Sequence, residues 1–478
     1  MRVLFATAEL APVAVVGGLA HAAAGLTAEL RRQGVEVDVV LPDYGGVELA
    51  DEHARPISVP GWARPATVRS GEHAVVGRLH LVRTNGIARS HPYLRPDGRG
   101  WPDNAERFIG FSRAIASMTL ADPPDLLHVN DWHTGVVLAA FVEPPPSVLS
   151  LHNLAYQGVT DGSWLGRLGP RAEHYEWWGG TNPLSGAIAL ADKIVAVSPN
   201  HSREILTPEG GFGLDGALRN RWADVSGILN GIDQSVWDPA TDPHLTATYS
   251  IDQGVGAVIA AKAANRRALG DRFGWPDDGT PVATMVTRLT AQKGVDLILP
   301  IVPVLRQIPL RLAVLGAGEA AIVTELATLA TAHPEQFAFA EGYDDELSHR
   351  LFAGADLYLM PSRFEPCGLA QMQAMRYGAI PVVTNVGGLH DTVPDADEHP
   401  DGNGYVADRV DSVAVVSALF RAARGLADRR RRPALVRRIM KLDWSWRGPA
   451  AEYVNLYRTL LPSNFVDMSE RSELDDDR

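Results

Sequence analysis

The chain has 478 residues, of which 46% are hydrophobic and 21% are charged, and its formal net charge at pH 7 is -13. The composition is typical of a soluble globular protein, the length predicts two domains, and the negative charge argues against nucleic-acid binding. No apolar run approaches the ~20 residues that a membrane-spanning helix needs. The single cysteine, Cys367, excludes an internal disulfide, and the amino terminus resembles a first strand rather than a signal peptide. Together these features predict a cytoplasmic protein.

The first half of the chain alternates short apolar runs with helical sequence. A glycine-rich turn and an Ala/Leu-rich helix, which extends to about residue 32, separate the first two predicted strands. The predicted strands of this half cover residues 3–6, 35–41, 126–129, 147–151 and 193–197. Strand and helix in alternation are typical of a parallel sheet with helices on both faces. We therefore predict a doubly wound, Rossmann-like domain over residues 1–240.

The same pattern starts again after a stretch rich in Pro, Asp and Thr at residues 238–253, which we interpret as a linker. The strands predicted in this half cover residues 282–286, 310–315, 356–360 and 380–383. We predict a second doubly wound domain over 254–440 and a helix at 441–465 that returns to the first domain. Two such domains in tandem predict a cleft between them, with ligands at the carboxyl ends of the strands.

Arginines crowd the segment 421–441, which contains four in succession from Arg429 to Arg432. In an acidic protein this helical spacing favours a solvated helix face over an anion-binding patch. The last residues, 466–478, are polar and acidic, and we predict that they are disordered.

A glycine pair, Gly17 and Gly18, follows the first strand and opens the first predicted helix. Loops of this kind often hold a phosphate group at the amino end of the helix. Here, however, Val15 and Val16 precede the glycines, and no cation lies beside them in the sequence. From the residues alone the stretch is either a phosphate loop without its cation or a tight turn.

Four polar or glycine-rich stretches come at the ends of predicted strands, where loops that face a cleft should lie. They are HVNDWHTG at 128–135, SLHNLAYQG at 150–158, VTRLTAQKGVDLIL at 286–299 and PSRFEPCGLAQMQAMRYG at 361–378. We therefore expect functional side chains in these stretches.

Arg288 and Lys293 are five residues apart, just beyond a predicted strand. Two cations there can hold both phosphates of a nucleoside diphosphate and neutralise the charge that develops as it leaves. The alternative is a surface salt bridge, but lysine is scarce in this chain, which favours a function for Lys293. Glu365 lies at a loop-to-helix junction whose free N–H groups could bind an anion, although its carboxylate could equally cap the helix.

Histidines and an aspartate follow two of the strands in the first half. His152 could be a base, a ligand or a buried histidine with satisfied hydrogen bonds. Asp131 and His133 suggest a metal site, but no third ligand has suitable spacing, so we predict no metal. The sequence contains neither a serine nucleophile elbow nor a Walker lysine loop.

Several stretches, taken in order, resemble the glycogen and starch synthases from the first strand to Trp446. They are VNDWHTG, HNLAYQG, GILNGIDQSVWDP, TRLTAQKG, VLGAG, GYDDELSHR and PSRFEPCGL. The resemblance implies the α/β fold called GT-B, in which two Rossmann-like domains face each other across a cleft. It also implies a retaining glycosyltransferase that uses no metal or other cofactor. This family transfers glucose from a nucleotide diphosphate to the 4-hydroxyl group of an α-glucan.

The resemblance also assigns roles on the donor side. Arg288 and Lys293 would bind the donor pyrophosphate, and Tyr343 would pack against the base. Glu365 would hold the donor sugar and phosphate together with backbone N–H groups of Cys367, Gly368 and Leu369.

In the first half of the chain, His152 would lie under the reacting sugar and Asn182 would reach its hydroxyl groups. Asp131 would border the acceptor, and we place His133 on the same side. Gly17 and Gly18 would form the donor loop. The residues that we expect to be catalytic are Arg288, Lys293, His152 and Glu365.

The chain departs from the family at several positions of the expected pocket. Where the family reads Lys-Thr-Gly-Gly-Leu-Ala-Asp, this chain reads Val-Val-Gly-Gly-Leu-Ala-His from Val15 to His21. Ser185 replaces a lysine and Ala370 a threonine. The segment 384–388 replaces a stretch that is usually arginine-rich and ends in Thr-Gly-Gly, and His390 follows it. The scaffold motifs remain while the chemistry of the pocket has changed.

This contrast favours an enzyme that has acquired another substrate. It would transfer a nucleotide-activated sugar or cyclitol to a small carbohydrate or amino-sugar acceptor in specialised metabolism. A pseudo-glycosyltransferase, which forms a C–N link, is one such enzyme. The alternatives are a glycogen synthase that extends an α-1,4-glucan from ADP-glucose, and a non-catalytic protein that binds nucleotide sugars.

Overall fold

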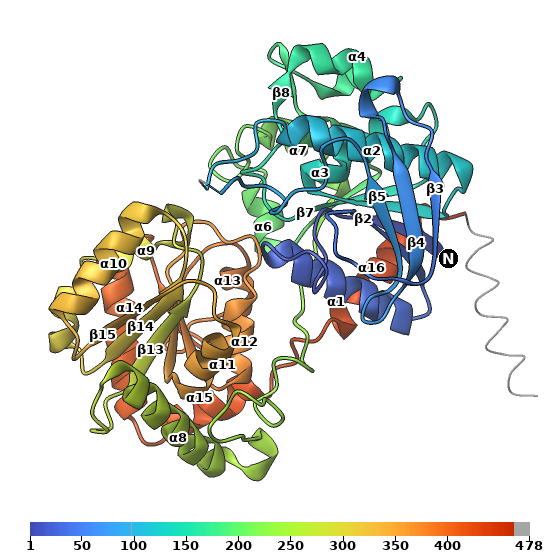
Figure 1. Cartoon of the computed structure of the whole chain (residues 1–478). Helices are drawn as coiled ribbons and strands as arrows, with labels where there is room; N and C mark the ends of the chain where they lie inside the picture. The colour runs from blue at the N-terminus through green and yellow to red at the C-terminus, as the bar shows by residue number, and fades with distance from the viewer. Residues whose placement is uncertain (97, 463–478) are drawn as a thin grey trace, which may run out of the picture. The chain divides into compact units, whose positions relative to one another are not determined.

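The computed structural model describes residues 1–96 and 98–462 (Figure 1). The described residues divide into two compact units, the first formed by Met1–Gly231 with residues 446–462, and the second by Ile232–Ser445. The segment 466–478, predicted to be disordered, lies outside the described residues.

The first unit is built on a nine-stranded sheet with the order β12-β11-β7-β6-β1-β2-β5-β4-β3. The strands from β12 to β5 run parallel, and β4 and β3 extend the sheet antiparallel at one edge. The bounds are β1 Arg2–Ala6, β2 Glu36–Pro42, β3 Ala50–Pro56, β4 Thr67–His73, β5 Gly77–Arg83, β6 Leu126–Asn130, β7 Ser147–Leu151, β11 Lys193–Ala196 and β12 Val225–Gly227.

Helices cover both faces of this sheet, as the alternation of its side chains requires (Figure 1). Val3 and Phe5 of β1 pack with α1 (Gly18–Arg32) and α16 (Arg447–Leu460), whereas Leu4 and Ala6 pack with α2 (Asn104–Ala121). The remaining helices of the unit are α3 Asp131–Gly135, α4 Leu165–Leu168, α5 Pro183–Leu190, α6 Pro199–Glu204 and α7 Asp215–Asn220. Strands β8 (Thr160–Asp161), β9 (Glu176–Trp177) and β10 (Gly180–Thr181) form a small separate sheet.

A buried hydrogen-bonded chain fastens α16 to the centre of the sheet. The ring nitrogens of His128 on β6 lie 2.6 Å from the Tyr457 hydroxyl and 2.8 Å from the Ser150 hydroxyl. Ser150 on β7 lies 3.1 Å from the Tyr453 hydroxyl. Because burial disfavours the imidazolium, and His152 adds a smaller effect, the pKa of His128 is lowered to about 3. The carboxyl-terminal helix therefore belongs to the first unit.

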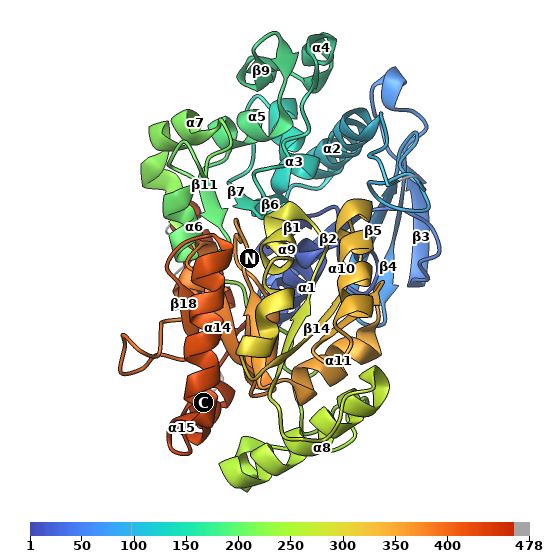
Figure 2. The same ribbon diagram turned by 90° about the vertical axis from the view of Figure 1, so that its left-hand side faces the viewer.

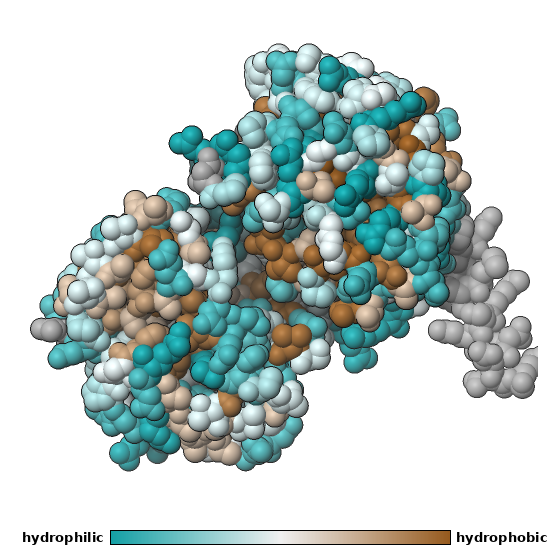
Figure 3. Space-filling view, viewed as in Figure 1, coloured by the Kyte–Doolittle hydropathy of each residue, from teal (hydrophilic) through white to brown (hydrophobic). Residues whose placement is uncertain are grey.

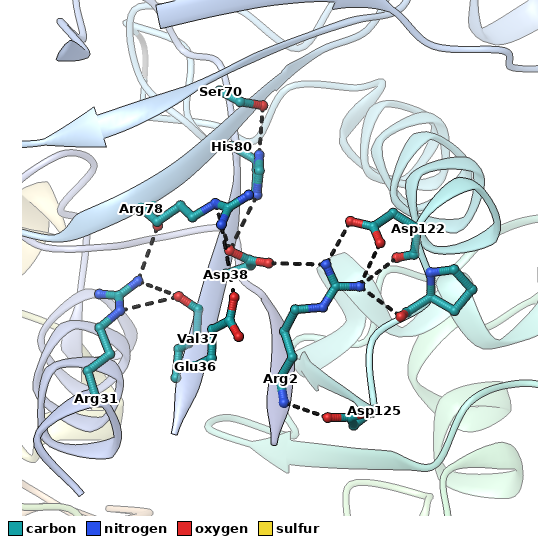
Figure 4. A network of polar contacts seen from close by, with 11 residues as sticks. Arg2, Arg31, Glu36, Val37, Asp38, Ser70, Arg78, His80, Asp122 and Asp125 are labelled. Carbon is teal, nitrogen blue, oxygen red and sulfur yellow. Dashed lines mark hydrogen bonds and ion pairs between the residues drawn. The ribbon is translucent and has the colours of Figure 1, made fainter. Parts of the chain in front are cut away.

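A second polar network lies near the amino ends of these strands (Figure 4). Arg2 of β1 forms two hydrogen bonds with the Asp122 carboxylate, at 2.7 and 2.8 Å, and its guanidinium also approaches Asp38 of β2. Burial alone would raise the pKa of Asp38, but the hydrogen bond and charge of His80, with Arg78 and Arg2, lower it. The network lies near the edge opposite to the loops predicted to carry function, so we assign it a structural role.

The second unit contains a six-stranded parallel sheet with the order β15-β14-β13-β16-β17-β18. Figure 2 shows two of its strands, β14 and β18, with helices of the same unit around them. Helices α8 (Val255–Phe273) and α11 (Asp345–Gly354) pack on one face, and α14 (Ser412–Ala427) packs on β17 and β18. The strands are β13 Val282–Val286, β14 Arg311–Gly316, β15 Phe337–Glu341, β16 Leu357–Met360, β17 Ile380–Thr384 and β18 Tyr405–Ala407. The other helices are α9 Val295–Ile298, α10 Ala320–Ala332, α12 Ala370–Arg376, α13 Gly387–Thr392 and α15 Arg431–Met440.

The stretch interpreted as a linker, 238–253, is part of the second unit. Asp242 is buried, and its carboxylate accepts hydrogen bonds from Tyr377 (2.5 Å) and from His349 (2.7 Å). The Tyr249 hydroxyl donates to the Tyr377 carbonyl oxygen at 2.8 Å. The chain therefore passes from the first unit to the second at Gly231, before the Pro-rich stretch. The composition resembled a linker because this segment packs through polar side chains rather than through an apolar pattern.

The arginine-rich segment is not uniformly solvated, so this prediction was wrong for part of it. Arg432 lies 2.5 Å from the fully buried carboxylate of Asp356, and Arg421 forms ion pairs with Asp395 and Asp397. Arg429 and Arg430 remain exposed, as predicted. The sequence could not separate these arginines, since their partners lie far away along the chain.

Within the described residues, no helix has the length and apolar character that crossing a membrane requires. In the space-filling view, hydrophobic side chains gather over the part of the first unit where α1 lies (Figure 3).

Candidate functional site

Lys293 and Glu365 form an ion pair at the carboxyl end of the second sheet. Lys293 ends the turn that follows β13, and Glu365 lies in the loop after β16. The Lys293 Nζ atom is 2.5 Å from Glu365 Oε2, which also accepts a hydrogen bond from Ser362 Oγ at 3.1 Å. The exposed fractions of the two side chains are 15% and 6%, so the pair is largely withdrawn from water. Glu365 is not a helix cap, because α12 begins five residues later.

Glycine at position 294 makes this approach possible. Gly294 has φ +67°, and a Cβ atom there would collide with the carbonyl oxygen of Pro361. The loop that carries Lys293 therefore presses directly on the loop that carries Glu365. A side chain at this position would force the two loops apart and separate the ion pair.

Arg288 and Tyr343 line one pocket of about 330 Å³ at the same edge of the sheet. Tyr343 follows β15 and is 77% exposed. The Arg288 side chain forms no hydrogen bond or ion pair with any described residue. Asp344 and Asp345 lie in the same lining. An aromatic face, carboxylate acceptors and an unpaired guanidinium can together hold the base, the ribose and a phosphate of a nucleotide.

The Cys367–Leu369 segment precedes α12 and is shaped by glycine. Gly368 has φ +75°, and Leu369 has φ -109° and ψ -33°. The N–H groups of Gly368 and Leu369 make no hydrogen bond with the described residues. Because α12 has only seven residues, we attribute anion-binding capacity to these loop N–H groups rather than to the helix.

In the first unit, Asp131 and His152 meet at the ends of β6 and β7. Asp131 Oδ1 accepts the backbone N–H of His152 at 2.7 Å, and Asp131 adopts a left-handed φ of +50°. Burial raises the pKa of Asp131 to about 7, which the backbone N–H groups of His152 and Asn153 oppose and the charge of Glu9 reinforces. Asp131 therefore changes protonation near neutral pH, unlike an ordinary aspartate.

Asn130, which the sequence reasoning missed, fixes the tautomer of the His152 ring. His152 Nε2 lies 2.9 Å from Asn130 Oδ1, and Asn130 Nδ2 donates to the Ala6 carbonyl oxygen at 3.0 Å. Burial, with a smaller contribution from His201, lowers the pKa of His152 to about 3. The hydrogen bond to Asn130 places the proton on Nε2 and leaves Nδ1 as an acceptor. The only indication of a role for Asn130 in the sequence was its position immediately before Asp131.

His133 and Asn182 have well-defined structural partners. His133 is stacked on Trp132 with ring centroids 4.1 Å apart, and burial lowers its pKa to about 3. Asn182 caps α5, where its Oδ1 accepts the N–H groups of Leu184 and Ser185. Its Nδ2 donates to Gln157 at 2.8 Å. The substrate contacts that the resemblance assigned to these two residues remain predictions.

The glycine turn at the start of α1 already holds an anion from its own chain. Glu9 Oε2 accepts the N–H groups of Val16 at 3.0 Å and of Gly17 at 2.8 Å. The Tyr93 hydroxyl donates to Glu9 Oε1 at 2.9 Å. Val15, by contrast, is half exposed. The turn therefore presents an apolar side chain, and two of its N–H groups are occupied by an internal carboxylate.

Among the described residues, no group of three or more His, Cys, Asp or Glu side chains could hold a metal ion.

Two family models match the chain in succession. The starch synthase catalytic domain matches residues 2–220, and glycosyl transferases group 1 matches residues 271–431. The glycogen synthase of Rhodopseudomonas palustris (strain BisA53) is 40% identical, over 96% of this chain and 98% of its own length. That of Halorhodospira halophila is 41% identical, over 97% of this chain and 100% of its own length. The chain belongs to the glycogen and starch synthase family. It is therefore a glycosyltransferase.

Solved structures agree with this family assignment. The catalytic domain of starch synthase IV from Arabidopsis thaliana, bound to ADP and acarbose, is similar with a TM-score of 0.85 and 31% identity, over 96% of this chain and 98% of that one. Sucrose-phosphate synthase from Thermosynechococcus elongatus has a TM-score of 0.61 at 19% identity, over 96% and 98% of the two chains, and shows the fold alone. This member of the glycogen and starch synthase family has the α/β GT-B fold, as predicted.

Proposed function

We propose that this enzyme transfers glucose from ADP-glucose to an α-glucan with retention of configuration. The observation that carries the proposal is that the Lys293–Glu365 pair and the pocket of Arg288 and Tyr343 both lie at the carboxyl ends of the strands of the second sheet. The full-length relatives are named glycogen synthases, and a similar structure was solved with ADP and acarbose. These similarities support extension of a glucan over the specialised function that the altered pocket favoured.

The proposed chemistry needs fixed positive charge where the leaving group develops negative charge. The bond between the sugar C1 atom and the diphosphate oxygen breaks, and the acceptor oxygen bonds to C1 on the same face. The departing phosphate oxygen takes the acceptor proton, so no protein base is required. Arg288 and Lys293 would stabilise the diphosphate, and neutral His152 would accept a hydrogen bond from the sugar. With two cations in these roles, we propose that the reaction uses no metal.

Incubation with ADP-glucose and glycogen tests the proposal. We expect ADP release that matches glucose incorporation, and α-linked products on enzymatic digestion. The Arg288→Gln variant should lose this activity, whereas the Arg409→Gln variant should keep it, since Arg409 is an exposed residue paired with Asp411. ADP release without glucan extension, or no turnover, would contradict the proposal.

The glycine turn favours a second candidate, in which the donor or acceptor differs. Val15 provides no cation, and Glu9 occupies the N–H groups of Val16 and Gly17. A donor that forms a stabilised cation, such as an unsaturated cyclitol, would need less help at its diphosphate. Its acceptor would be a small carbohydrate or an amino sugar. A thermal-shift panel with ADP, UDP, GDP and dTDP separates the candidates, because a ligand of the native state raises its stability. A larger shift with a nucleotide other than ADP would support this second candidate.

A further inference from the structure

Gln371 is fully buried in the first turn of α12, and its amide group is directed at the Cys367–Leu369 segment. Its Nε2 atom donates to the carbonyl oxygens of Gly368 at 2.9 Å and of Cys367 at 3.2 Å. The same atom lies 3.2 Å from Thr392 Oγ1 on α13. One side-chain amide thus holds two successive carbonyl groups of the loop.

These two bonds determine where the loop N–H groups point. In a trans peptide the carbonyl and the following N–H point in opposite directions. Since the carbonyls of Cys367 and Gly368 face Gln371, the N–H groups of Gly368 and Leu369 face away from it. Gly368 has a left-handed φ and Leu369 a right-handed conformation. Successive N–H groups in such a pair form a concave site that binds anions.

The same amide is connected to the backbone of Glu365. Thr392 Oγ1 donates to the Gly388 carbonyl oxygen at 2.6 Å, and the Gly388 N–H donates to the Glu365 carbonyl oxygen at 3.0 Å. A Cβ atom on Gly368 would collide with the Gln371 amide, so only glycine fits there. The loop conformation is therefore fixed from two sides.

A glutamine at position 371 leaves a buried polar atom unsatisfied, and packing alone does not explain this cost. Its Oε1 atom is buried and has no hydrogen-bond partner among the described residues. An apolar side chain of similar length would fill the same space without an unsatisfied acceptor. The amide is therefore best explained by what its Nε2 atom does to the loop.

We propose that Gln371 is a positioning residue that turns the N–H groups of Gly368 and Leu369 toward the diphosphate of the donor. This inference rests on the proposed function, because it requires a nucleoside diphosphate as ligand. Gln371 acts through the loop and does not itself touch the substrate.

The test compares the binding of ADP and of adenosine, by calorimetry, to the full-length enzyme and to its Gln371→Met variant. Methionine keeps the length of the side chain but cannot donate. We expect ADP affinity to fall about tenfold, since a hydrogen bond to a charged group is lost or misdirected. Adenosine affinity should be unchanged, because adenosine has no phosphate.

Asn265 provides a matched control in the same unit. It is also buried, and its Nδ2 donates to the carbonyl oxygens of Ala247 at 2.8 Å and of Ala261 at 3.2 Å. It lies on α8 and outside the loops of the candidate site. The Asn265→Leu variant should lower the melting temperature without changing the ratio of ADP to adenosine affinity.

Four outcomes would overturn the inference. Unchanged ADP affinity in a folded Gln371→Met variant would overturn the inference and leave the proposed function intact. An equal loss of ADP and adenosine affinity would have the same consequence. If methionine prevents folding, Gln371→Glu offers the same shape with a group that repels the two carbonyls. If neither variant folds, Gln371 is a folding residue only. If the wild type binds none of ADP, UDP, GDP or dTDP, the proposed function itself fails. Should another of these nucleotides bind best, it and its nucleoside replace ADP and adenosine in the comparison.

Discussion

The ammonium group of Lys293 and the carboxylate of Glu365 lie 2.5 Å apart, although 72 residues separate them in the chain. Each charge offsets the cost of burying the other in a largely dry environment, and the Ser362 hydroxyl adds a hydrogen bond to the carboxylate. Removing only one partner leaves an uncompensated buried charge, which costs far more than the pair contributes. This relationship allows the proposed catalytic role of Lys293 to be separated from its structural role.

We expect Lys293→Met to lower the rate of donor turnover by about 10²–10³-fold, because one fixed cation at the leaving group is lost. It should also lower the free energy of unfolding by up to about 3 kcal/mol, since Glu365 loses its partner. Steady-state kinetics and urea denaturation measure the two effects. The double variant Lys293→Met/Glu365→Gln should recover stability but not activity.

Lys193 provides the control for this experiment, because it forms a surface pair with Asp224 in the first unit at 2.9 Å. Lys193→Met should leave turnover unchanged. If the double variant regained the wild-type rate, the pair would be structural only, and the proposed role of Lys293 would be wrong.

Arg288 should behave differently, because its guanidinium group has no partner among the described residues. Arg288→Gln should leave the melting temperature unchanged and weaken nucleoside diphosphate binding by at least tenfold, the effect of losing a hydrogen bond to a charged group. Calorimetric titration with ADP measures the effect. Equal ADP affinity in wild type and variant would remove Arg288 from the donor site.

His128 should make the stability of the first unit depend on pH. Its pKa is lowered to about 3 in the folded state, against about 6.5 for an unfolded histidine. The unfolded state therefore binds more protons between pH 6.5 and 3, so the free energy of unfolding falls as the pH falls through this range, by up to about 1.4 kcal/mol per pH unit. Urea denaturation between pH 4.5 and 7 should show a shallower slope for His128→Gln.

The exposed residue His53 on β3 provides the comparison, and His53→Gln should keep the wild-type slope. Asp131 acts with the opposite sign. Because its pKa is raised to about 7, the folded state binds the extra proton, and stability falls as the pH rises from about 4 to 7. Asp131→Asn should therefore steepen the rise of stability with pH, and an unchanged slope would contradict this assignment.

The stability of the second unit should depend in part on the contact between Arg432 and the buried carboxylate of Asp356. The buried carboxylate is 2.5 Å from Arg432, 3.0 Å from Arg266 and 3.0 Å from the Val282 N–H. Arg432→Ala should cost about 1–3 kcal/mol, the range for weakening the hydrogen bonding of a buried charged group. The exposed neighbour Arg430 provides the control, since Arg430→Ala should change stability by less than about 0.5 kcal/mol. Equal effects of the two substitutions would restore the interpretation of a uniformly solvated helix face.

The parallel strands could be predicted from sequence because each is a short apolar run closed by a turn. The predicted range 282–286 matches β13 residue for residue, and 193–197 exceeds β11 by one residue. Strand β3, with the sequence ADEHARP, could not be predicted. All of its side chains are exposed, and it is held by backbone pairing to β4 rather than by a buried face. Its sequence therefore carries no apolar alternation.

The sequence motifs identified residues of the candidate site, but they did not predict how those residues contact one another. Lys293 and Glu365 were both selected from the sequence, yet their direct contact depends on how two loops fold against each other. The position of Glu9 was not predictable, since its carboxylate reaches Val16 and Gly17 only because the chain turns between them. Gln371 was missed for a similar reason, because a buried glutamine on a helix has no distinctive sequence pattern.

The exposed valine beside the glycine turn provides a last prediction. The family resemblance implies a lysine at the position of Val15, which is 50% exposed, so an ammonium group can be added there without disturbing the core. If the turn contributes to donor binding as the family resemblance implies, Val15→Lys should raise the affinity for ADP-glucose about tenfold at low salt. The gain should shrink as salt is added, because exposed charges are screened.

Val142→Lys adds the same charge at a position of the same unit that is 79% exposed, and it should leave donor affinity unchanged. Donor titrations at 20 mM and 300 mM salt would compare the two variants with the wild type. An equal gain in donor affinity from both substitutions would mean that the change in net charge explains it, since this protein carries -13 overall. No gain from Val15→Lys would mean that Glu9, which already occupies the N–H groups of Val16 and Gly17, has withdrawn the turn from donor binding. In that event the enzyme would depend on Arg288 and Lys293 alone for the diphosphate, and a donor other than ADP-glucose would become the stronger candidate.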